Sequence, residues 1–374
     1  MTIIVRFDEL SGKVPWSQLQ HAGGPAIDTP EHLRAVWAGG RTSPDLASAG
    51  YGHLWSDLLG GQRVWSATAP AAYLLSMLVQ DEGFGDPDPT VRQGVLVFFR
   101  ELSMNVDVVD RQCDVASSIL DLVASSPVQA CRLLLPDLFQ VELLMLNDGD
   151  ARTASCAATA AVAIAARVHV AASDRAKIVQ WLNERARSTL SVTDRASALI
   201  DLGDLGHSQP EFLRDHHPAM RLAAALAPAM AEDDDATDVL LDLAESPARL
   251  DSVLSPANDS SWQTLPQFRG RPTSVVVAEV VTRRVRNIDH LARGALASLP
   301  LATSPGGQAI VRPYLSRIFR NGLPHPEAAT MTQKLIARGM VENRQFWDWC
   351  GRASLFQSLR LPSDEESWRV VVES

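Results

Sequence analysis

Apolar residues at helical spacing constrain the fold of this chain more than any other feature. Val91, Val95, Phe98, Phe99 and Leu102 lie at i, i+4, i+7, i+8 and i+11, which places them on one face of a helix. Similar stripes recur along the 374 residues, with short breaks rich in Asp, Pro, Gly and Ser between them. Amphipathic helices joined by short connections bury their apolar faces against one another. The pattern therefore predicts an all-α protein.

Strand-like alternation is scarce. We predict a strand over residues 2–7, where β-branched residues cluster, and a second over residues 369–372. Pro228 interrupts the helical stripe of Leu222, Leu226 and Met230, so we expect the helix to kink or end there.

A local signature repeats at helix starts. Segments 88–92, 148–152 and 215–221 each place an aspartate near the predicted N-cap, an apolar residue next and an arginine after it. Segments 193–196 and 288–296 are looser copies. Arg92 and Arg152 are 60 residues apart, and Arg152 and Arg221 are 69 apart. Two units in each interval give a period of about 30–35 residues, as in stacked helical pairs.

The residues of these segments resemble a known family. Asp-Pro-Thr-Val-Arg at 88–92 resembles the opening of the second helix of a HEAT repeat. The N-terminal segments Pro-Trp at 15–16 and His-Ala-Gly-Gly-Pro-Ala-Ile-Asp-Thr-Pro-Glu-His-Leu-Arg-Ala at 21–35 resemble a group of bacterial HEAT-repeat proteins common in actinobacteria, as do segments 67–75 and 359–364. Where that group has His-Gln-Gly-Thr-Val-Tyr, this chain has Gly-Gly-Gln-Arg-Val-Trp at 60–65. The resemblance implies an α-solenoid of HEAT-like helical pairs and protein binding, and it transfers no catalytic residue.

Composition along the chain suggests four parts. We predict an irregular N-terminal cap over 1–50, HEAT-like helical repeats over 51–254, a long loop over 255–274, and C-terminal helical repeats with a cap over 275–374. The N-terminus lacks the basic start of a signal peptide, and Arg and His interrupt the apolar stretch 151–172. No two of the four cysteines form a C-x-x-C pair, so we expect small buried residues and a cytoplasmic protein without a membrane partner.

The charge balance disfavours nucleic acid as a partner. The chain has 34 Lys and Arg against 44 Asp and Glu, which gives a net charge of −10. Nucleic-acid binding normally needs a basic footprint. The one basic cluster, Arg283, Arg284 and Arg286, suits the negative end of the helix that precedes it. An acidic surface better fits another protein, such as a basic toxin.

Two aromatic groups are the candidate partner-binding residues. Trp262, Phe268, Arg269 and Arg271 lie in the long loop, and Trp347 and Trp349 lie in the densest aromatic segment. The alternative for the loop is that its aromatics pin it to the helices. Trp residues at i and i+2 do not share a helix face, so we expect one in the core and the other half exposed.

Motifs that carry chemistry are missing. The sequence has no phosphate-binding glycine loop, nucleophile elbow or zinc-protease motif, so we predict no catalytic, cofactor or metal residues. Asp215-His216-His217 is best read as the start of a helix, and the acidic run Asp233, Asp234, Asp235 as a capped turn. The other histidines show no ligand spacing.

These observations predict a non-enzymatic protein–protein interaction module. One concrete form is a cytoplasmic immunity protein that neutralises a toxin, because acidity would steer it to a basic nuclease. The alternative is a HEAT-like DNA-repair glycosylase or another nucleic-acid-acting enzyme, with Trp181, Trp262 and Asp289 at an extruded base.

Overall fold

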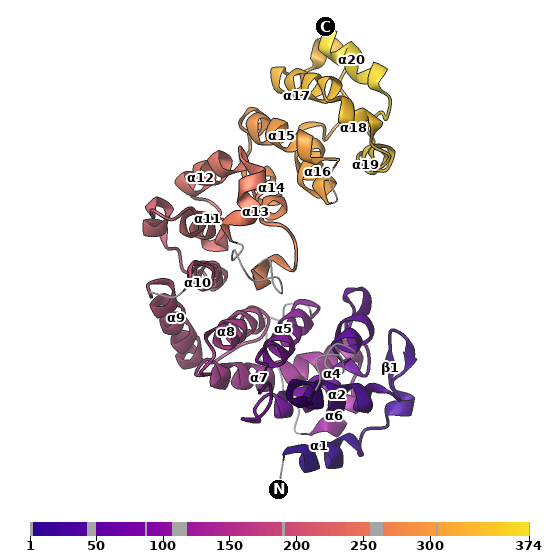
Figure 1. Ribbon diagram of the computed structural model, residues 1–374, viewed down its shortest axis with the longest axis vertical. Helices are drawn as coiled ribbons and strands as arrows, with labels where there is room; N and C mark the ends of the chain where they lie inside the picture. The colour runs from indigo at the N-terminus through magenta and orange to yellow at the C-terminus, as the bar shows by residue number, and fades with distance from the viewer. Residues whose placement is uncertain are drawn as a thin grey trace. The chain divides into compact units, whose positions relative to one another are not determined.

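The protein is almost wholly helical (Figure 1). This computed structural model describes residues 3–42, 50–86, 88–106, 118–188, 191–254, 265–303 and 306–373. The chain divides into two compact units, Met1–Ser188 and Thr189–Ser374, and the division falls inside the predicted stretch 51–254. Within the described residues, every helix is too short or too polar to cross a membrane.

The first unit contains helices, short turns and one small hairpin. Its helices are α1 (Ile3–Ser11), α2 (Thr29–Thr42), α4 (Thr68–Leu78), α5 (Thr90–Met104), α6 (Ile119–Ala124), α7 (Pro127–Met145), α8 (Ala151–Ala165) and α9 (Ala172–Ala186). Its turns are η1 (Trp16–Gln18), η2 (Leu54–Leu58) and η3 (Gly60–Gln62). Strands β1 (Gln20–His21) and β2 (Gly24–Pro25) form an antiparallel pair.

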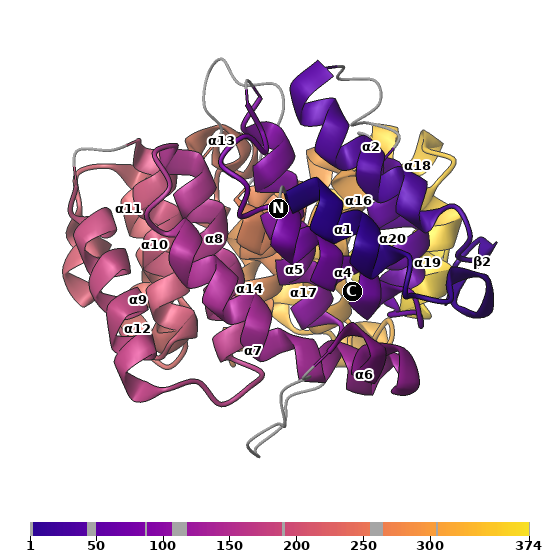
Figure 2. The ribbon, with the colours of Figure 1, turned by 90° about the horizontal axis from the view of Figure 1, so that it is seen from below.

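Helix α8 is the centre of the first unit. It packs against α5 and α7, beside which it lies in both views (Figures 1 and 2). Its side chains are mostly alanine, and those of Ala157, Ala160 and Ala161 are fully buried. Small side chains allow neighbouring helix backbones to approach closely and leave no room for larger ones.

In the second unit, α11 also packs through small buried side chains, as α8 does in the first unit. The helices of the second unit are α10 (Val192–Asp204), α11 (Pro218–Leu226), α12 (Asp234–Ala244), α13 (Pro247–Val253), α14 (Thr273–Arg284), α15 (Ala292–Ser298), α16 (Gly307–Ile318), α17 (Met331–Glu342), α18 (Arg344–Asp348), α19 (Arg352–Leu359) and α20 (Glu365–Glu373). Short turns η4 (Pro210–Arg214), η5 (Pro228–Met230), η6 (Pro266–Phe268), η7 (Ile288–Leu291), η8 (Leu299–Leu301) and η9 (Pro326–Ala328) connect them. Helix α10 packs on α11 and α11 on α12, which are neighbours in sequence, whereas α12 packs on α14 and α14 on α16, each two helices further along the chain.

Both predicted strands are wrong. Residues 3–7 of the first predicted strand belong to α1, where Phe7 and Ser11, four residues apart, are buried. Residues 369–372 belong to α20, where Trp368 and Val371 are buried three residues apart. Packing against α4 and α17, respectively, decides the conformation over local β propensity.

The predicted caps and breaks are largely present. Asp150 caps α8 by accepting from the Thr153 amide at 2.7 Å, and Asp233 caps α12 through the Ala236 amide at 2.8 Å. Helix α11 ends at Leu226, before Pro228. The looser copy at 288–296 differs, because Asn287, not Asp289, accepts the cap bond of η7.

Arginines of the repeated signature reach neighbouring aspartates. Arg92, at the start of α5, donates to Asp148 Oδ2 at 2.7 Å, and both side chains are mostly buried. Gln93 donates to the capping carboxylate of Asp150 at 3.0 Å. The two helix starts are thereby joined by charge-assisted hydrogen bonds.

Cysteines only partly follow the expectation of burial. Cys131 and Cys156 are buried, and burial raises the pKa of the Cys131 thiol to about 12. Cys350 is exposed, and Cys113 lies outside the described residues.

Overpacking the centre of the first unit should destabilise it. We expect Ala161→Leu to lower the free energy of unfolding by about 1–3 kcal/mol, because the added carbons meet closely packed helices. Ala176→Leu, at an exposed position of α9, is the matched control and should change it by less than about 0.5 kcal/mol. Urea unfolding followed by circular dichroism measures both, and equal effects would contradict the packing argument.

Glu142 of α7 is fully buried, and neither carboxyl oxygen has a hydrogen-bond partner among the described residues. Burial raises the pKa of Glu142 well above its usual value, because the folded protein favours the protonated carboxyl over the charged one. The unfolded chain ionises it at an ordinary pKa. Its contribution to stability is therefore full in acid and falls as the pH rises above the unfolded pKa.

We expect Glu142→Met to stabilise the protein at pH 7, because about 1–3 kcal/mol is the usual cost of an unpaired buried polar group. The advantage over the wild type should shrink as the pH is lowered toward 4. Unfolding curves at several pH values measure this, with Glu184→Met on an exposed position of α9 as the control. If the gain in the free energy of unfolding does not vary with pH, the ionisation of Glu142 is not its cause.

Candidate functional site

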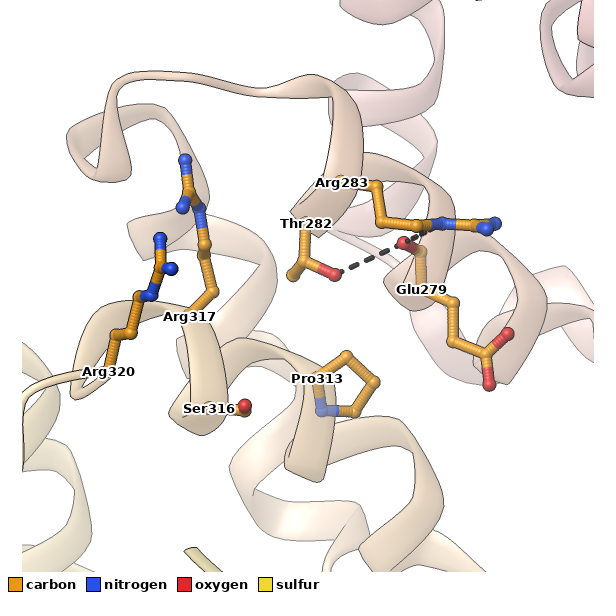
Figure 3. Close-up of a pocket in the computed structure, with 7 residues that line it drawn as sticks. All are labelled: Glu279, Thr282, Arg283, Pro313, Ser316, Arg317 and Arg320. Carbon is orange, nitrogen blue, oxygen red and sulfur yellow. Dashed lines mark hydrogen bonds between the residues drawn. The ribbon is translucent and has the colours of Figure 1, made fainter.

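A groove with arginines on its walls lies between α14 and α16 of the second unit (Figure 3). Its volume is about 450 Å³. Helix α14 contributes Glu279, Thr282 and Arg283, and α16 with the residues after it contributes Pro313, Ser316, Arg317 and Arg320. The groove therefore carries three cations and one carboxylate in a chain whose net charge is −10.

Two of these arginines stand side by side on one wall (Figure 3). Arg317 donates through Nη2 to the carbonyl oxygens of Val285 and Arg286, at 3.3 and 3.4 Å, while its Nε is buried without a partner among the described residues. Arg320 is exposed, with no hydrogen bond or ion pair to the described part of the chain. Two adjacent guanidinium groups repel each other, so an anion bound between them would be stabilised.

The carboxylate of the groove is already paired. Arg271 donates to Glu279 Oε2 at 2.5 Å, and Arg283 donates through Nε to the backbone oxygen of Glu279 at 3.1 Å. The side chain of Arg283 follows the opposite wall, pointing away from Arg317 and Arg320 (Figure 3). Because Arg271 neutralises Glu279, the excess positive charge is concentrated at Arg317 and Arg320.

The predicted loop anchors lie close to this groove in sequence but have different environments. Phe268 is 3% exposed, which makes it a core residue of the second unit. Arg269 is exposed with a left-handed backbone (φ 54°), and Arg271 pairs with Glu279. Trp262 lies outside the described residues. A partner-binding role for these residues stays a prediction.

The two C-terminal tryptophans divide as expected. Trp347 is buried and donates from Nε1 to the Met340 carbonyl at 2.7 Å, whereas Trp349 is half-buried. Trp349 lies 6.3 Å from the Phe346 ring, centre to centre. The pair thus offers a partner at most the outer side of Trp349.

The basic cluster separates into residues with different roles. Arg283 lines the groove and Arg286 is exposed beyond α14. Arg284 instead reaches the C-terminal end of another helix, α11. Its guanidinium donates to the carbonyl oxygens of Ala225 at 2.7 Å, Leu226 and Ala227 at 3.3 Å and Met230 at 3.4 Å. Ala225 and Leu226 are the last residues of α11, whose carbonyls a helix end leaves without intrahelical donors, while Ala227 and Met230 belong to the turn that follows.

Asp215-His216-His217 starts a helix, as predicted. His217 caps α11 by accepting from the Ala219 amide, and Asp215 accepts from the His217 amide. The residues proposed for a glycosylase are dispersed through the chain. Trp181 is on α9 of the first unit, under the guanidinium of Arg185, whereas Asp289 is in the second unit and accepts from Thr332.

Histidines and aspartates converge in the first unit, although the sequence predicts no metal-ligand spacing among these histidines. His21 ends β1, Asp28 precedes α2, and His53 precedes η2. One ligand atom from each of the three lies within 4.8 Å of the others. His32 stacks on His53 with ring centres 4.3 Å apart, and Asp57 is also in contact. We call these five residues the His/Asp cluster.

Each imidazole of the His/Asp cluster faces a carboxylate. His21 Nε2 is 2.9 Å from Asp28 Oδ1, and His32 Nε2 is 3.5 Å from Asp28 Oδ2. His53 Nδ1 is 3.1 Å from Asp57 Oδ2. Burial, reinforced by the nearby His32, lowers the pKa of His53. Burial alone would raise the pKa of Asp28, but hydrogen bonds from His21 and the backbone outweigh it and lower that pKa.

Glycine makes the hairpin turn of this cluster possible. A side chain at Gly23 would lie 3.0 Å from His21 Cε1 and 3.2 Å from Asp57 Oδ1, and Gly24 has φ 125°. The local signal for the cluster was present in the sequence. Asp28 with His32, and His53 with Asp57, are each four residues apart, which places each pair on one helical face.

Comparison of the chain with protein-family models, with curated proteins and with solved structures finds no match in any of the three.

Loss of the Arg284 guanidinium should destabilise the second unit. We expect Arg284→Met to lower the free energy of unfolding by about 1.5–3 kcal/mol, because it removes charged donors from carbonyl groups at the end of α11. Arg286→Met, at an exposed position two residues away, should have little effect. Thermal and urea unfolding compare the two variants. If Arg284→Met has the same free energy of unfolding as the wild type, the guanidinium does not stabilise the end of α11.

Proposed function

We propose that the chain is a non-enzymatic protein–protein interaction module on a HEAT-like solenoid. Three features support this: helices close in sequence pack on one another within each unit, Asp150 of the repeated signature caps α8, and residues 88–92 resemble the opening of a HEAT-repeat helix. Surfaces of this kind bind partners along their faces without catalytic residues.

The arginine groove carries the proposal furthest. Arg317 and Arg320 lie side by side with no free carboxylate in the groove, since Glu279 pairs with Arg271. Guanidinium groups bind carboxylates through paired, charge-assisted hydrogen bonds. We infer that the groove takes an acidic segment of a partner protein, rich in Asp or Glu. The positive charge of the groove is opposite in sign to the net charge of the chain.

The narrower form, an immunity protein that neutralises a basic toxin, remains part of this proposal. The net charge of −10 would steer a basic partner to the rest of the surface, while the groove holds an acidic segment of the same partner. A DNA-repair glycosylase is the alternative, and phosphate groups would then occupy the groove.

A labelled peptide of eight glutamates tests the groove directly by fluorescence anisotropy with the full chain. We expect Arg320→Glu to weaken binding at least tenfold, because it removes one guanidinium and adds a repelling carboxylate. Arg338→Glu is the matched control. It makes the same change in net charge at an exposed position of α17 that does not line the groove, and we expect a much smaller effect at 0.1 M salt, which screens exposed charges.

Two results would refute this function. Equal weakening by Arg320→Glu and Arg338→Glu would mean that binding follows net charge alone. Tighter binding of an oligothymidylate than of the glutamate peptide, lost in Arg320→Glu, would assign the groove to nucleic acid instead. Unfolding curves of both variants check that the fold is intact.

A further inference from the structure

We propose that the His/Asp cluster of the first unit binds a first-row divalent cation such as Zn²⁺, with His21, Asp28 and His53 as its ligands. Their ligand atoms lie within 4.8 Å of one another. Ligands at about 2.0–2.2 Å from a tetrahedral zinc ion are about 3.3–3.6 Å apart. Small side-chain movements therefore suffice to close the site.

The orientation of His53 favours this role. Asp57 Oδ2 is a hydrogen-bond acceptor 3.1 Å from His53 Nδ1, so the ring carries its proton on Nδ1. The Nε2 lone pair then faces the Thr29 hydroxyl at 3.0 Å, which donates to it. A carboxylate on one nitrogen and an available lone pair on the other is the usual arrangement of a metal-binding histidine.

Asp57 lies near the Nδ1 atom of each of the two buried histidines, His21 and His53. Its Oδ1 is 3.9 Å from His21 Nδ1, and its Oδ2 is near His53 Nδ1. The Nε2 atom of His21 faces the other carboxylate, Asp28, at 2.9 Å. Asp57 therefore orients the His53 ring and lies near His21, while Asp28 lies where a ligand is needed. Two imidazoles and one carboxylate also leave coordination positions for water.

Cation binding replaces hydrogen bonds that the ligand atoms already make in the unliganded protein. His21 Nδ1 accepts from the Gly23 amide at 3.0 Å, so the proton of the neutral ring is on Nε2 and is donated to Asp28. A cation on Nε2 takes the place of this proton, which then resides on Nδ1 and faces Asp57. The Gly23 hydrogen bond is lost in the exchange. No proton is gained or released overall.

Titration with Zn²⁺ tests the site in the full-length, tag-free protein after chelator treatment. Calorimetry should give one strongly bound equivalent, and Co²⁺ should give the visible absorption of a nitrogen- and oxygen-ligated ion. Asp28→Asn, whose side chain is half exposed, should abolish strong binding without unfolding the chain. We expect Asp57→Asn to weaken it about 10–100-fold, as is usual for an orienting carboxylate.

His216→Gln is the matched control, because His216 is an exposed histidine beside an aspartate, Asp215, outside the His/Asp cluster. It should bind Zn²⁺ like the wild type. The proposal is overturned if the wild type binds neither ion, if Asp28→Asn binds as tightly as the wild type, or if His216→Gln removes binding. His53→Gln substitutes a second ligand and should also remove strong binding. If His53→Gln does not fold, the result for Asp28→Asn alone tests the proposal.

Discussion

Close packing around small side chains is the constraint on which the fold depends. Alanine is the most frequent buried residue of helix α8, and α11 similarly buries Ala219, Ala223 and Ala225. Alanine contributes little apolar area per residue, so such helices are stabilised by the neighbours that reach their backbones. Stability is therefore spread over many short helices. Polar caps add to this at some helix starts, as at α8, where Asp150 of the repeated signature accepts from the Thr153 amide.

Helical periodicity and cap chemistry could be predicted from the sequence because both are local. The stripe from Val91 to Leu102 forms α5, and Asp150 and Asp233 cap the helices that they precede. The predictions for residues 2–7 and 369–372 were wrong because β-branched runs are locally ambiguous. There, burial of Phe7 and of Trp368 against other helices determined the outcome.

The candidate sites were less predictable, since each combines segments that packing brings together. Arg283 and Arg317 are on different helices, and the second was not singled out in the sequence. The His/Asp cluster joins a hairpin, the start of α2 and the residues around η2. Four-residue spacings of His and Asp were visible, but nothing local indicated that the two pairs would meet.

The reach of Arg284 also bears on how the chain matures during synthesis. Its guanidinium meets carbonyl oxygens of a helix whose last residue, Leu226, precedes it by 58 positions. A nascent chain that has emerged only as far as α13 leaves these oxygens to water. The end of α11 is therefore completed late in translation, and the second unit reaches its final stability only once α14 has left the ribosome.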